Sequence, residues 1–177
     1  MKPFSARTLL IALALSVSAL AQMPMPKPSA ELKKLDYFVG NWTMDADAKP
    51  GLMGPGGKMS LKEKNEWMDG GFFVIVHSRF SSEKMGSGTG ISLMGYNPED
   101  KTYFYDEYNS MGEAARSTGT NEGDTWTWMG EQKMGPQVMK GRFIMKILSP
   151  TAYNFKYEIS TDGATWNLVM EGKATKS

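Results

Sequence analysis

The chain has 177 residues with no Cys, 15 Met and 19 Gly, and its 20 Lys and Arg nearly balance its 19 Asp and Glu. The absence of Cys excludes a disulfide framework and a thiolate metal site. The near-neutral charge argues against a nucleic-acid-binding surface. Because 41% of the residues are hydrophobic and 11% are aromatic, a disordered chain is also excluded and one globular domain is expected.

The N-terminus has the order of a secretory signal peptide. Lys2 and Arg7 precede an apolar run at 9–20, which ends in the small-residue pattern Ala19-Leu20-Ala21. This run is shorter than the roughly 20 residues needed to span a bilayer. We predict a signal peptide at 1–21, no membrane span in the mature chain, and an exported protein that is periplasmic or secreted. A retained N-terminal membrane tether is the alternative.

A proline-rich leader and a short helix should follow. Residues 22–29 alternate Pro with long side chains, and each Pro lacks an N–H for a helix or a sheet ladder, so this leader is expected to be disordered or extended. The folded domain should then occupy residues 30–177. Ser29 is placed to cap a helix running to Phe38, with Leu32 and Leu35 on the same buried stripe.

After Gly40 the hydrophobic period changes to two, which is typical of strands. The alternation predicts about ten short strands, at 41–47, 58–68, from 72 onward, 88–96, 102–110, 113–121, 124–130, 139–147, 153–159 and 166–170. Turn sequences separate them, including tight hairpins at Gly70-Gly71 and Asp162-Gly163. A meander of this kind buries its apolar face best as an all-β, up-and-down antiparallel barrel, which also removes exposed edges.

Several segments carry a family resemblance. The helix running into Gly40-Asn41-Trp42 resembles the opening of lipocalins and related calycin barrels. Further segments are similar to a bacterial exported, lipocalin-like family of unknown function: GYNP at 95–98, KTY at 101–103, NSMG at 109–112, STDGATW at 160–166 and EG at 171–172. The resemblance covers about residues 30–175. It implies a barrel with Trp42 closing its base, and no established activity.

Cofactor and metal binding receive little support from the sequence. The nitrobindin-like haem barrels, a neighbouring calycin group, open in the same way and bind haem through a His near the C-terminus. Residues 167–177 contain no His, and His77 is the only one in the chain, so no cofactor is predicted. Met23 and Met25 on the leader offer thioethers to a soft metal such as Cu(I). Adaptable packing is the favoured interpretation of the Met enrichment, and no metal site is predicted.

The candidate site rests on polar residues that fall among apolar ones. Glu63 and Asn65 are in phase with Leu61, so they should point into the barrel as a polar wall, with Arg79 or Arg116 as a partner for the carboxylate. A β-bulge that turns both residues to water is the alternative. The candidate ligand-binding residues are Trp42, Glu63, Asn65, Trp67, His77, Arg79, Tyr105, Arg116, Phe143 and Tyr157.

His77 has two interpretations, an outward or hydrogen-bonded structural residue and a pocket base or ligand, and the first is favoured. The leading functional hypothesis is an exported protein that holds a small apolar or amphipathic molecule in a barrel cavity. One alternative is a filled barrel with an interaction or envelope role. Another is an enzyme that uses His77 with Glu63 or Asp106, although no catalytic motif supports it and no catalytic residue is assigned.

Overall fold

The computed structural model describes residues 26–177 apart from 53, 135 and 136. The predicted signal peptide, residues 22–25 of the leader and the two leader methionines lie outside the described residues. Residues 26–29 have no regular secondary structure. Within the described part of the chain, no helix is long and apolar enough to cross a membrane.

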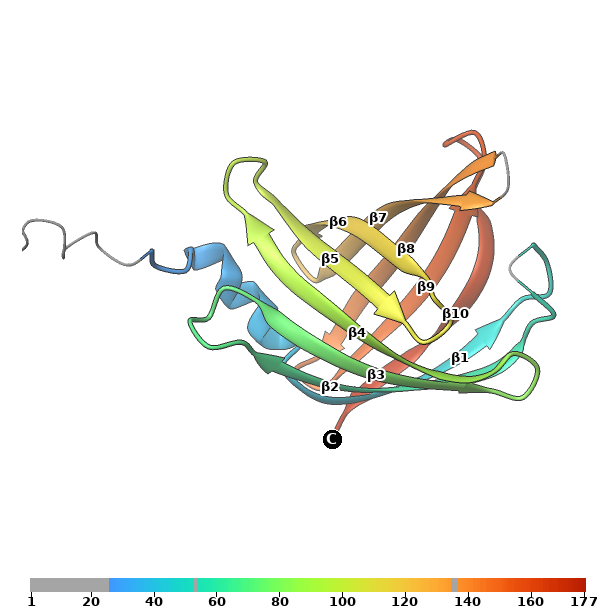
Figure 1. Cartoon of the computed structure of the whole chain (residues 1–177), viewed down its shortest axis with the longest axis horizontal. Helices are drawn as coiled ribbons and strands as arrows, with labels where there is room; N and C mark the ends of the chain where they lie inside the picture. The colour runs from blue at the N-terminus through green and yellow to red at the C-terminus, as the bar shows by residue number, and fades with distance from the viewer. Residues whose placement is uncertain (1–25, 53, 135–136) are drawn as a thin grey trace, which may run out of the picture.

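The predicted all-β barrel with one short N-terminal helix is confirmed (Figure 1). A 3₁₀ helix, η2, is followed by ten antiparallel strands in a meander, and β1 closes the barrel by pairing with β10. The elements are η2 (Ala30–Tyr37), β1 (Gly40–Ala48), β2 (Gly57–Trp67), β3 (Val74–Ser82), β4 (Gly86–Asn97), β5 (Thr102–Asn109), β6 (Ala114–Glu122), β7 (Thr125–Met134), β8 (Gln137–Ser149), β9 (Ala152–Ser160) and β10 (Asn167–Lys176).

Alternation along each strand sorts the side chains between core and solvent. In β1, Trp42, Met44 and Ala46 are buried, as predicted, while the residues between them are more exposed. Register then aligns inward residues of neighbouring strands. Trp126 of β7 pairs with Met145 of β8, and its indole stacks on that of Trp128 with ring centroids 5.7 Å apart. The interior is therefore lined largely by aromatic and Met side chains.

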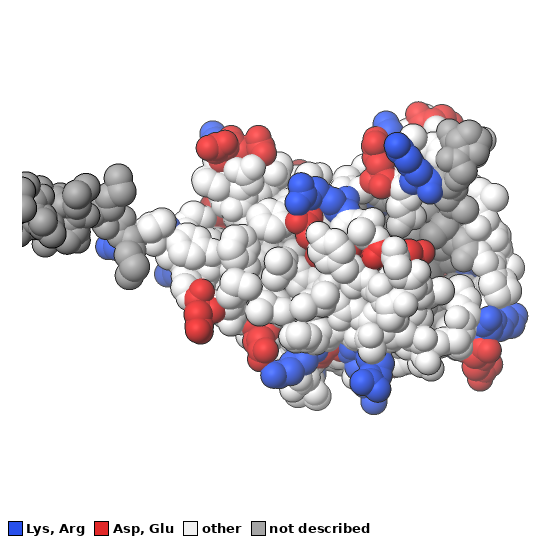
Figure 2. Space-filling model, in the orientation of Figure 1, with Lys and Arg blue, Asp and Glu red and all other residues white. Residues whose placement is uncertain are grey.

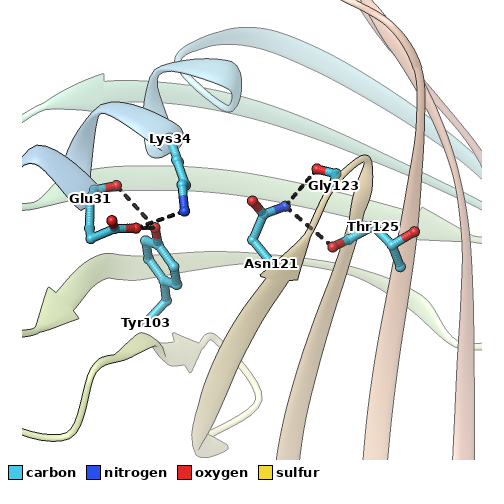
Figure 3. A network of polar contacts seen from close by, with 6 residues as sticks. All are labelled: Glu31, Lys34, Tyr103, Asn121, Gly123 and Thr125. Carbon is cyan, nitrogen blue, oxygen red and sulfur yellow. Dashed lines mark hydrogen bonds and ion pairs between the residues drawn. The ribbon is translucent and has the colours of Figure 1, made fainter.

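Helix η2 lies across one end of the barrel, which we call the base. Its buried face matches the prediction, because Leu32, Leu35 and the following Phe38 are all 5% exposed or less. The hydroxyl of Tyr103 donates to the Glu31 carbonyl and to its carboxylate, both at 3.0 Å (Figure 3). The cap prediction is wrong, since Ser29 makes no side-chain cap hydrogen bond. The helix is instead held to the strands by its own side chains.

Trp42 lies at the base, as the calycin resemblance implies. Its indole N–H donates to the Phe38 carbonyl at 2.8 Å, so the first strand is attached directly to the end of η2. The ammonium of Lys176, near the C-terminus, donates to the Tyr37 carbonyl at 2.8 Å and lies 5.0 Å from the centroid of the Trp42 ring. Both ends of the folded domain therefore meet at the base.

Two predicted tight hairpins are longer loops. The turn at Gly70-Gly71 is closed by the Met68 N–H, which donates to the Phe73 carbonyl at 2.8 Å, so more than two residues connect β2 and β3. At Asp162, the carboxylate accepts hydrogen bonds from the N–H groups of Ala164 and Thr165 at 2.8 and 2.7 Å. These bonds stabilise a longer loop, and β10 begins only at residue 167.

The position of Trp166, which is predicted to start the last strand, also differs from the prediction. It lies before β10, beneath the guanidinium of Arg142, which is 4.0 Å from its ring centroid. Arg142 is on the outer face and donates a hydrogen bond to the outward Glu158. A register shift between Leu168 and Met170 then brings Met170 to the inner set. The bulge explains why Met170 faces inward although Leu168, two residues earlier, lies opposite the outward Glu158.

Candidate functional site

The barrel interior, or lumen, is lined by both buried and partly exposed side chains. Buried residues lie around η2 and also toward the other end of the barrel, where Met139 and Ile159 are buried. Other inward residues keep some surface accessible to water although they point away from the outer face; these are Met59, Leu61, Glu63, Tyr105, Glu107, Phe143, Tyr157 and Met170. Part of the lumen wall is therefore accessible to water. Concave sites with mostly apolar walls and few polar groups are the usual ligand sites of proteins.

Two carboxyl groups face this lumen. Glu63 comes from β2, as alternation predicts, and Glu107 comes from β5, where it pairs in register with the buried Ser92 of β4. Burial raises the pKa of Glu63, and the nearby charge of Glu107 raises it further. Burial also raises the pKa of Glu107. Both shifts arise because a carboxylate loses hydration inside the barrel and gains no cation in return.

Asn65 fixes the acidic side of the lumen to the base. Its Nδ2 donates to the Phe38 carbonyl at 3.1 Å and to Oε2 of Glu63 at 3.2 Å. These two bonds use both amide hydrogens. The Oδ1 of Asn65 is then buried with no hydrogen-bond partner, and so is the Oγ of Ser92. The inward prediction for Glu63 and Asn65 is confirmed, and the outward alternative is not observed.

Tyrosine rings form the walls beside these groups. Burial raises the pKa of both Tyr105 and Tyr157, so both phenols stay neutral at physiological pH. Tyr157 of β9 lies against Gly141 of β8, where a Cβ would be only 2.5 Å from the phenol oxygen. The missing side chain of Gly141 therefore makes room for the Tyr157 ring on the lumen wall.

The ten predicted site residues divide between the two faces of the barrel. Seven lie inside or at the base: Trp42, Glu63, Asn65, Trp67, Tyr105, Phe143 and Tyr157. The other three, His77, Arg79 and Arg116, are exposed on the outer face. Glu107 and Ser92 were missed, although the same alternation places Glu107 in phase with Tyr105.

The predicted partners for the Glu63 carboxylate are wrong. Arg116 forms a bidentate ion pair with Asp106 on the outer face, with N–O distances of 2.6 and 2.7 Å. Arg79 stands opposite Lys62 in the register, again on the outer face. Each arginine is one residue out of phase with the lumen, so the sheet separates it from Glu63.

The outward interpretation of His77 is confirmed. It is exposed in the middle of β3, and Glu63 points to the other side of the sheet, so the two cannot converge on one substrate. Asp106 is already held by Arg116. The proposed catalytic combinations of His77 with Glu63 or Asp106 are therefore not supported by the geometry.

His77 and Arg79 instead line an open groove of about 820 Å³ on the outside of strands β1 to β5. Lys62 and Lys64 contribute to the same groove, as do the exposed Ile91 and Tyr108. Over the face shown in Figure 2, charged side chains of both signs are scattered between larger uncharged areas. No group of three His, Asp or Glu side chains within the described ranges is placed to hold a metal ion.

Comparison with known proteins identifies the family. Residues 27–176 match the model of the protein family of unknown function DUF1579, and the chain belongs to that family. A search of the curated proteins finds no match.

Two solved structures share the fold. Rv2717c from M. tuberculosis is similar with a TM-score of 0.58 and 8% identity, over 85% of this chain and 99% of that one. The S-type phycobiliprotein lyase CPES from Guillardia theta is similar with a TM-score of 0.53 and 9% identity, over 84% of this chain and 93% of that one. At these identities the likeness concerns the barrel fold alone.

Proposed function

We propose that this protein binds a small apolar or amphipathic molecule in the lumen of its barrel. The observation that carries the proposal is the partial exposure of inward apolar side chains, since Leu61, Phe143 and Met170 point inward yet keep contact with water. Such apolar surface inside a barrel is favourably covered by an apolar ligand, at about 25 cal/mol per Å² removed from water. Met and aromatic side chains adapt well to a ligand of irregular shape.

The solved barrels support the architecture of this proposal. CPES, which has a similar barrel fold, is by its name a phycobiliprotein lyase. That activity does not transfer to this chain at 9% identity. What the present chain shares with it is the barrel fold.

A neutral fluorescent probe tests lumen binding. Nile red should bind saturably to the purified protein and emit more strongly in the apolar lumen. Leu61→Trp adds volume to the inner face of β2 and should weaken binding by about tenfold or more. Lys62→Trp places the same ring on the outer face of the same strand and should leave lumen binding unchanged.

The two variants also distinguish the outer groove, because Lys62 lines it. Loss of binding in Lys62→Trp with normal binding in Leu61→Trp would move the site to that groove. Failure of Nile red to saturate on the folded wild-type protein would contradict the proposed function. Far-UV circular dichroism of each variant confirms that the barrel is intact.

We further propose that the protein acts outside the cytoplasm, as its N-terminal sequence indicates. Expression of the full chain in a bacterial host should give a mature protein beginning at Gln22. Intact-mass measurement of the exported fraction checks this cleavage. A protein that keeps residues 1–21 and stays in the cytoplasm would contradict it.

A further inference from the structure

The polar groups of the lumen form an unbalanced set. Glu63 and Glu107 each bring a carboxyl group to the inner face, and neither takes part in an ion pair among the described residues. The recorded ion pairs join side chains on the outer face, in η2 or in the loops. Lys176, a basic residue at the base, already donates to the Tyr37 carbonyl. Negative charge in the lumen is thus without a cation.

Two buried neutral side chains in the lumen also lack a partner. Asn65 is 3% exposed and Ser92 is 1% exposed, and in each the side-chain oxygen has no hydrogen-bond partner. Asn65 is attached to Glu63 through its other amide atom, and Ser92 lies directly opposite Glu107 in the sheet register. Buried polar atoms are nearly always paired in folded proteins, so two orphans beside two unpaired carboxyl groups indicate a missing partner.

The chemistry of these atoms defines that partner. An amide oxygen and a carboxylate only accept hydrogen bonds, and a serine hydroxyl accepts as well as donates. A ligand that satisfies them must supply several N–H or O–H donors. A protonated amine supplies three donors and a positive charge, and nearby aromatic faces such as that of Tyr105 also attract cations.

We propose that the lumen recognises a ligand with an apolar body and a cationic amine, and that Glu63 and Glu107 hold the ammonium group. This inference rests on the proposed function and specifies its ligand class. The apolar body would occupy the wall of Leu61, Phe143 and Met170. The ammonium would lie between β2 and β5, within reach of the two orphaned oxygens. The raised pKa of each glutamate supports the proposal, because a cation between them would relieve their repulsion.

Three probes with the same alkyl chain isolate the charge: n-octylammonium, 1-octanol and octanoate, measured by isothermal titration calorimetry at neutral pH. Wild-type protein should bind octylammonium about tenfold more tightly than octanol, and octanoate most weakly. In the double variant Glu63→Gln, Glu107→Gln the preference for octylammonium over octanol should disappear. The single variants should each lose part of the preference.

A matched control removes the same charge from the outer face of the same two strands. Glu66 of β2 and Asp106 of β5 both point outward and pair with Lys64 and Arg116. The variant Glu66→Gln, Asp106→Asn should therefore keep the full preference for octylammonium. Equal loss in both double variants would show an effect of overall charge and would overturn the proposal.

Other outcomes separate the two proposals. If octanol and octylammonium bind wild type equally, or octanoate binds best, the cationic ligand is wrong while lumen binding stands. If none of the three binds but Nile red saturates, the amine class is again wrong and the binding function survives. If neither Nile red nor any of the three binds, both proposals fail.

Discussion

Glu63 and Glu107 face the same lumen from β2 and β5, and the charge of one raises the pKa of the other. Burial is the larger cause for each residue. Two carboxyl groups in this setting oppose each other's ionisation. The folded state is therefore destabilised when both are charged. A binding role would explain why two carboxyl groups lie inside a domain whose other inward side chains are largely apolar.

The first prediction concerns the pH dependence of stability. Because the folded pKa of Glu63 is raised, the folded state binds more protons than the unfolded chain between the ordinary and the raised pKa, so the free energy of unfolding falls as pH rises through this window. Glu63→Gln cannot ionise and can still accept from Asn65. It should be more stable than wild type by about 1 kcal/mol near pH 8, with the difference shrinking toward about pH 4.

Urea denaturation across this pH range measures the effect. Glu66→Gln is the control, because Glu66 lies on the outer face of the same strand and its pKa is lowered, first by its hydrogen bond to Lys64. That variant should gain nothing as the pH rises. An equal gain in both variants would show that general charge, and not burial of Glu63, sets the pH dependence.

The second prediction concerns the outer cluster of Arg142, Glu158 and Trp166. Burial raises the pKa of Glu158, but hydrogen bonds from Lys156 and Arg142 lower it more, so the net shift is downward. Arg142→Ala removes the 2.5 Å bond to this 8% exposed residue and uncovers the Trp166 ring. It should destabilise the fold by about 1–2 kcal/mol at neutral pH, measured by urea denaturation.

Arg142→Lys tests the geometry behind that loss. Lysine keeps the charge but lacks the planar group that stacks on Trp166, so it should recover only part of the stability. Full recovery would mean that the stacking contributes nothing. Below the pKa of Glu158 the difference between wild type and Arg142→Ala should shrink, because the protonated carboxyl no longer needs a cation.

The third prediction concerns the attachment of η2. Tyr103→Phe removes both hydrogen bonds to Glu31 and should reduce stability by about 1 kcal/mol. Amide hydrogen exchange should accelerate locally in residues 30–37. Tyr96→Phe is the matched control, because Tyr96 packs 5.0 Å from Tyr103 and its hydroxyl makes no hydrogen bond among the described residues. Equal acceleration in both variants would contradict a specific role for the Tyr103 hydroxyl.

The fourth prediction concerns the lumen wall. Gly141→Ala places a methyl group 2.5 Å from the phenol oxygen of Tyr157 and 3.0 Å from the nearest ring carbon, so the ring must move. The expected loss is about 1–3 kcal/mol, as for other overpacked sites. In a Tyr157→Ala background the same change should be nearly neutral. A double-mutant cycle that shows no coupling between the two positions would contradict this contact.

Alternation predicts which residues line the barrel wherever the strands are regular. Glu63 and Asn65 were placed correctly because β2 keeps its period of two through both residues. Glu107 carries the same signal, since it is in phase with Tyr105, but the pattern of a single strand does not show which carboxyl groups face the same part of the lumen. The convergence of β2 and β5 is a property of barrel closure.

The wrong predictions have a different physical origin. Arg79 and Arg116 are predicted as partners of Glu63 because a buried carboxylate is expected to have an internal cation. Their own phase along β3 and β6 was the better guide, and it puts both outside. Trp166 was misplaced because the side-chain hydrogen bonds of Asp162 lengthen the preceding loop, and a Gly after an Asp does not reveal that length.

The closure of the barrel by β1 and β10 has a consequence for how the chain folds. Every other strand pairs with its neighbour in sequence, whereas Trp42 must find Lys176 across almost the whole domain. Contacts of such wide sequence separation form late, because the entropy of closing the loop must be met first. Until the last strand has left the ribosome, β1 keeps one free edge. A chaperone that shields this edge would protect the nascent barrel from aggregation.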